Sequence, residues 1–146
     1  MTLTADLLVT HLRLAGVLLA GLAVLNVFVP SRFRWREELA RVSLLNREIF
    51  QVHTIFLIVT LTLFSALLLT SADALVEPAR LPRAILAGLT LFWGLRMLMQ
   101  WFYYSPAIWR GHPFNTLMHV LFSGLWIYFT AVFGTAFWFV ASVRTS

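Results

Sequence analysis

Four stretches of the chain are predominantly apolar and are separated by short polar segments. They cover residues 7–29, 49–70, 83–104 and 114–140. A helix needs about 20 residues to cross a hydrocarbon layer about 30 Å thick, and each stretch is long enough. Backbone groups find no hydrogen-bond partners in lipid, so a helix is the conformation that such stretches adopt. The pattern predicts an all-α integral membrane protein with four transmembrane helices.

The connections between these stretches are short, which favours antiparallel packing of consecutive helices. We expect one domain, residues 1–146, folded as an up-down-up-down four-helix bundle. Pro30 is expected to end the first span, because proline has no N–H to donate to the preceding turn. Gly88 and Gly94 are expected to permit close approach of the third helix to a neighbour.

The segment 31–48 differs from its surroundings because it holds five arginines and three glutamates. Its apolar residues Trp35, Leu39, Val42 and Leu45 recur at helical spacing, so one face of a helix would be apolar. This pattern predicts an amphipathic helix that lies in the membrane interface, or a solvated forward extension of the second span.

Composition agrees with a membrane location and excludes several kinds of chemistry. Apolar residues make up 60% of the chain and charged residues 12%, a balance that a soluble domain of this size could not hide from water. All 11 basic residues are arginines, and they lie mostly in the connections, so we expect no nucleic-acid partner. The chain has no cysteine, which excludes disulfides, thiolate metal sites and Fe–S clusters.

The arginines also predict an orientation. Connections 30–48 and 105–113 hold Arg32, Arg34, Arg36, Arg41, Arg47 and Arg110, whereas the opposite side holds Arg13, Arg80, Arg83 and Arg144. Cytoplasmic connections carry an excess of Lys and Arg. We therefore expect both termini on the non-cytoplasmic side of a membrane of the bacterial inner-membrane type.

Polar side chains within the spans gather near the arginine-rich ends, within about 12 Å of them at 1.5 Å per helical residue. Two of the spans carry these groups as stripes at helical spacing: Trp93, Arg96, Gln100 and Tyr103, and Asn115, His119, Ser123, Trp126 and Thr130. The stripes should face inward, because a charge directed at lipid costs about 3 kcal/mol or more. The predicted buried site consists of His53, His119, Arg96, Gln100, Asn115, Asn26, Trp93 and Trp126. Trp101, Tyr103, Tyr104 and Trp109 are assigned to an aromatic belt at headgroup depth.

Three functions are compatible with such a site. The first is an accessory or assembly subunit of a larger membrane complex, in which interhelical hydrogen bonds fix the helices. The second is an electron-transfer subunit that binds haem b, with His53 and His119 as axial metal ligands facing each other across the bundle. The third is an enzyme or carrier that binds a membrane lipid headgroup with Arg96 and a histidine. The sequence leaves open whether the chain is an enzyme.

Overall fold

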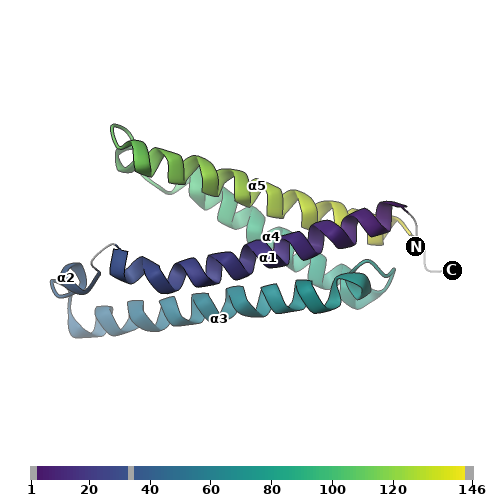
Figure 1. Cartoon of the computed structure of the whole chain (residues 1–146), viewed down its shortest axis with the longest axis horizontal. Helices are drawn as coiled ribbons and strands as arrows, with labels where there is room; N and C mark the ends of the chain where they lie inside the picture. Colours follow the sequence, from purple (N-terminus) through teal and green to yellow (C-terminus); the bar gives the residue numbers. More distant parts are fainter. Residues whose placement is uncertain (1–2, 33–34, 144–146) are drawn as a thin grey trace. The chain divides into compact units, whose positions relative to one another are not determined.

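The computed structural model describes residues 3–32 and 35–143, without the side chains of residues 29, 31, 32, 36 and 38. The elements are α1 (Leu3–Arg32), α2 (Trp35–Leu39), α3 (Leu44–Leu75), α4 (Arg80–Phe102), the 3-10 turn η1 (Pro106–Ile108) and α5 (Pro113–Ser142) (Figure 1). In the described part of the chain, α1, α3, α4 and α5 are long and apolar enough to cross a membrane. The all-α prediction is confirmed, and the chain is a small membrane protein of four such helices.

The order of the helices across a membrane and the orientation of the termini stay predictions. Two of the arginines compared for the orientation, Arg34 and Arg144, lie outside the described residues.

Two helix boundaries differ from those that the sequence predicts. α1 continues through Pro30 and ends at Arg32, so the expectation that Pro30 ends the helix is wrong. A proline this close to a helix end removes one hydrogen bond, the one that the carbonyl of Asn26 would accept, and leaves the rest of the helix intact. α3 begins at Leu44, where the side-chain oxygen of Ser43 accepts a hydrogen bond from the backbone N–H of Asn46 (3.4 Å). The segment 31–48 thus divides into the short helix α2 and a forward extension of α3.

The chain forms two compact units, which are described separately. The α1–α3 unit comprises Leu12–Ala72, and the α4–α5 unit comprises the described residues of Met1–His11 and Asp73–Ser146. The prediction of a single domain stays a prediction.

Within the α1–α3 unit, α1 approaches α3 closely at a glycine. A side-chain carbon added at Gly16 would lie 3.0 Å from Cγ of Leu69 and 3.1 Å from Cβ of Leu68. The buried hydroxyl of Ser65 uses this proximity to donate a hydrogen bond to the Gly16 carbonyl (2.8 Å). Gly88 does not have the expected role, because a side-chain carbon there would meet nothing within 4 Å.

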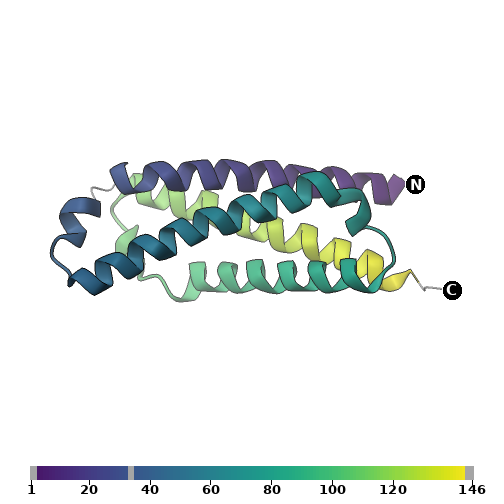
Figure 2. The same cartoon turned by 90° about the horizontal axis from the view of Figure 1, so that it is seen from below.

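Within the α4–α5 unit, α4 and α5 form an antiparallel hairpin (Figure 2). Its largest fully buried side chains include Trp93, Phe129 and Phe133. Near one end of the hairpin, the guanidinium of Arg83 donates a hydrogen bond to the Val140 carbonyl (3.4 Å). The polar residues of α4 and α5 that the sequence predicts as part of a site lie toward the other end, where α4 meets η1 and α5.

Candidate functional site

The side-chain amide of Gln100 joins α4 to α5 in the polar site of the α4–α5 unit. The Gln100 side chain is buried, with 7% of its surface exposed. Its oxygen accepts hydrogen bonds from the guanidinium of Arg96 (3.2 Å) and the indole N–H of Trp126 (3.4 Å). Its nitrogen lies 2.9 Å from Nδ1 of His119. The Gln100 amide thus holds the side chains of Arg96, His119 and Trp126.

These contacts determine where His119 carries its hydrogen. Arg96 and Trp126 are donors only, so the amide atom that they share must be the Gln100 oxygen. The amide nitrogen therefore donates to Nδ1 of His119, which accepts through its lone pair. In this arrangement the ring hydrogen of His119 lies on Nε2.

The Arg96 guanidinium is half-buried and surrounded by aromatic rings. Its central carbon lies 4.9 Å from the ring centroid of Trp126 and 5.8 Å from that of Tyr104. Such cation–π contacts stabilise a guanidinium by about 0.5–2 kcal/mol. Arg96 forms no ion pair with a described carboxylate, so its positive charge has no acidic partner among these residues. Only one of its five N–H donors is used by Gln100.

Aromatic rings enclose the other members of the site. The ring of Trp109 stacks on the His119 ring at 4.0 Å and an interplanar angle of 16°. Trp126 stacks on Trp93 at 5.1 Å on one side and on Phe122 at 5.7 Å on the other. Trp93 is buried, and its indole N–H has no hydrogen-bond partner among the described residues. The rings restrict His119 and Trp126 to the orientations that the Gln100 hydrogen bonds require.

Some members of the predicted stripes serve local structure instead. The amide of Asn115 donates to the Ile108 carbonyl (2.8 Å), which fastens η1 to the start of α5. Ser123 accepts a hydrogen bond from the indole of Trp101 (3.3 Å). The stripe on α4 predicted that Tyr103 lies beside Arg96. In the structure Tyr103 is 79% exposed, and the ring of Tyr104 lies beside Arg96 instead. The cause is that α4 ends at Phe102, so helical spacing no longer applies beyond it.

The two remaining predicted residues belong to the α1–α3 unit. Nδ1 of His53 donates to the Ile49 carbonyl of its own helix (2.8 Å), and the side chain is exposed. The amide of Asn26 donates to the Leu22 carbonyl (2.8 Å) and also lines a pocket of this unit. The prediction that His53 and His119 face each other involves residues of both units, and it stays a prediction.

The hydrogen bonds of His119 do not suit a haem ligand. An imidazole binds iron through a nitrogen lone pair. In His119 the Nδ1 lone pair accepts from Gln100, Nε2 carries the hydrogen, and Trp109 covers a ring face. The residues around His119 therefore do not fit haem, and the site is better described as a hydrogen-bonded network with one cation.

Sequence reasoning missed two residues of the site and one further polar pair. Trp109 and Tyr104 contact His119 and Arg96 from the connection between α4 and α5, where helical spacing cannot place a side chain. His11 and Tyr128 form a further polar pair, with Nδ1 of His11 3.1 Å from the tyrosine hydroxyl. The aromatic content of the connection was the available signal, and it was assigned to a membrane belt.

Comparisons of the chain with protein-family models, with curated proteins and with solved structures find no match. The function is therefore inferred from the chemistry of the described residues.

Proposed function

We propose that the chain is a membrane protein that binds the headgroup of an anionic phospholipid, with Arg96 as the residue that meets the phosphate. The observation that carries this proposal is the half-buried guanidinium of Arg96, which is held in place without an acidic partner among the described residues. Arginines within membrane spans are rare and pair with an acceptor. A lipid phosphate is the acceptor that the membrane itself supplies.

The surroundings of Arg96 suit a phosphate at the membrane interface. Arg96 lies six residues before the end of α4, which corresponds to about 9 Å along the helix, within reach of the headgroup region for a long side chain. The planar guanidinium matches two phosphate oxygens at once. Gln100 and the ring of Trp126 hold the group before a lipid arrives, so less side-chain entropy is lost on binding.

The test is to measure phosphatidylglycerol retained per protein by mass spectrometry after purification in mild detergent. Arg96→Gln removes the charge and should reduce retention about tenfold, the equivalent of one charge-assisted contact. Arg96→Lys keeps the charge but loses the planar fork, so its retention should be intermediate. Arg110→Gln removes an exposed arginine from the nearby connection and serves as the control. Equal retention by Arg96→Gln and wild type would refute the proposal.

A second candidate is an accessory or assembly subunit of a larger membrane complex. It is favoured by the Gln100 amide, whose own atoms bond to His119 and Trp126 and so hold α4 against α5. A subunit of this kind should be recovered from gently solubilised membranes with one partner at fixed stoichiometry. Gln100→Leu should lower that recovery in proportion to its loss of folded protein. Recovery of the chain alone from its native membrane would argue against this candidate.

A further inference from the structure

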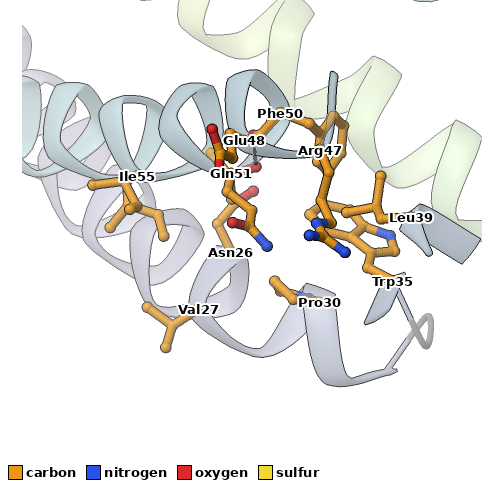
Figure 3. A pocket seen from close by; sticks show the side chains of 12 residues that line it. Asn26, Val27, Pro30, Trp35, Leu39, Arg47, Glu48, Phe50, Gln51 and Ile55 are labelled. Atoms are coloured by element: carbon orange, nitrogen blue, oxygen red, sulfur yellow. Dashed lines mark hydrogen bonds between the residues drawn. The ribbon is translucent and has the colours of Figure 1, made fainter. Parts of the chain in front are cut away.

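The α1–α3 unit contains a pocket that the polar residues of the sequence did not predict. It has a volume of about 630 Å³ and lies between the end of α1, the short helix α2 and the start of α3 (Figure 3). This volume is in the range of small-molecule sites, about 300–1,000 Å³. Its lining combines charged and amide groups with apolar ones: Asn26, Val27, Pro30, Trp35, Leu39, Arg47, Glu48, Phe50, Gln51, Thr54, Ile55 and Ile58.

The chain forms this pocket through the way α2 is attached. The ring of Trp35 on α2 meets the ring of Phe50 on α3 edge to face, with centroids 4.7 Å apart. Residues 47, 51, 54 and 58 follow one another at helical spacing and present one face of α3 to the pocket. α2 has only five residues, so it covers the first turns of that face and leaves the space beside them open.

Among its described lining residues, the pocket carries one cation and one carboxylate, which form no ion pair with each other. Arg47 and Glu48 both line it, and neither forms an ion pair with a described residue. In the view of Figure 3, Glu48 lies on the same side of the pocket as Gln51 and Asn26, and Arg47 lies on the other side. Separated opposite charges with no net charge favour a ligand that itself carries both charges.

Acceptors for a cationic group are concentrated around Glu48. The side chain of Gln51 has no hydrogen-bond partner among the described residues, which leaves its amide oxygen available. Pro30 has no N–H, so the Asn26 carbonyl lacks the helical donor that it would otherwise accept from. An ammonium group has three donors and no acceptor, which matches this set of oxygens.

The position of the pocket suits a lipid. The apolar span of α1 ends at Phe28, and Arg47 and Glu48 lie in the first turns of α3. The charged residues of the pocket therefore lie where the apolar spans end, at the depth expected for lipid headgroups. Ile55 and Ile58 continue the lining from the charged part toward the middle of α3. A headgroup could therefore bind at the charged part while an acyl chain runs along the isoleucines.

We propose that this pocket binds a zwitterionic aminophospholipid through its phosphoethanolamine group. Arg47 donates hydrogen bonds to the phosphate, and Glu48, with the oxygens of Gln51 and Asn26, accepts from the ammonium. The site is separate from Arg96 and does not depend on the function proposed for that residue. The chemistry of the headgroup is shared with free phosphoethanolamine, and the apolar lining favours the lipid.

The test is native mass spectrometry of the delipidated full chain, titrated with phosphatidylethanolamine or phosphatidylglycerol of identical acyl chains. Arg47→Gln should weaken phosphatidylethanolamine binding about tenfold through loss of a charge-assisted contact. Glu48→Gln gives the pocket a net positive charge, so it should weaken phosphatidylethanolamine and strengthen phosphatidylglycerol. Arg41→Gln, an exposed neighbour outside the pocket lining, is the matched control and should bind both lipids as wild type does.

Three results would overturn the proposal. The first is wild-type affinity of Arg47→Gln and Glu48→Gln for phosphatidylethanolamine, with folding of both variants checked by circular dichroism. The second is an unchanged lipid preference in Glu48→Gln, with the same ratio of phosphatidylethanolamine to phosphatidylglycerol affinity as in wild type. The third is competition by soluble phosphoethanolamine at the concentration at which the lipid itself binds, which would show that the apolar lining contributes nothing.

Discussion

The two units use polar residues near helix ends in opposite ways. In the α4–α5 unit, the Gln100 amide has its oxygen and nitrogen bonded to three side chains. In the α1–α3 unit, the charges of Arg47 and Glu48 line a pocket without described ion-pair partners. Polar groups that satisfy one another rigidify a helix pair, whereas unpaired groups beside a cavity remain available to a ligand. The Gln100 amide thus holds α4 against α5, whereas the charged side chains of Arg47 and Glu48 line an open pocket.

The largest expected effect separates the two glutamines. Gln100→Leu leaves the donors of Arg96 and Trp126 and the Nδ1 of His119 without a partner, and should lower the free energy of unfolding by about 2 kcal/mol. Gln51→Leu removes a side chain with no described partner and should change it by less than about 0.5 kcal/mol. Thermal unfolding in detergent, followed by circular dichroism, measures both. Equal destabilisation would mean that the two sites do not differ as described.

The next effect concerns the α1–α3 unit away from its pocket, where α1 packs closely against α3 at Gly16. Gly16→Ala places a carbon 3.0 Å from Cγ of Leu69 and 3.1 Å from Cβ of Leu68, so these side chains must shift by a few tenths of an ångström. Overpacking of this kind destabilises by about 1–3 kcal/mol. Gly21→Ala is the matched control on the same helix, where a side-chain carbon meets nothing within 4 Å. It should be neutral or stabilising by up to about 1 kcal/mol, and the same unfolding experiment on both variants distinguishes the cases.

The smallest effect concerns His53. Its ring bonds only to the Ile49 carbonyl of its own helix and is exposed, so His53→Ala should change the free energy of unfolding by less than about 0.5 kcal/mol. His119→Ala removes the acceptor of Gln100 and the ring that stacks on Trp109, and should destabilise by about 1–2 kcal/mol. The difference between the two variants in thermal unfolding is the measurement. Equal losses would imply that the histidines act as a pair, as the haem hypothesis requires.

Much of the fold follows from the sequence because hydrophobic length alone identifies the four helices. The structure brings Arg96, Gln100 and His119 into contact, and all three lie well inside α4 and α5, where helical spacing applies. Helical spacing failed for Tyr104 and Trp109, which lie in the connection, and for Asn115, whose amide meets a loop carbonyl.

The close approach at Gly16 and the pocket could not be predicted for a different reason. Both depend on how side chains of separate helices meet. The spacing of residues along one helix predicts which face they share, but not the distance to the neighbouring helix. Pro30 illustrates the same limit, because a proline near the last turn is tolerated when only one carbonyl loses its donor.

The most direct test of the difference between the units is native mass spectrometry of one sample that contains equal amounts of phosphatidylethanolamine and phosphatidylglycerol. Arg96→Gln is predicted to lose phosphatidylglycerol and keep phosphatidylethanolamine, whereas Arg47→Gln is predicted to lose phosphatidylethanolamine and keep phosphatidylglycerol. Loss of both lipids in each variant, or of neither, would contradict the assignment of two chemically distinct sites.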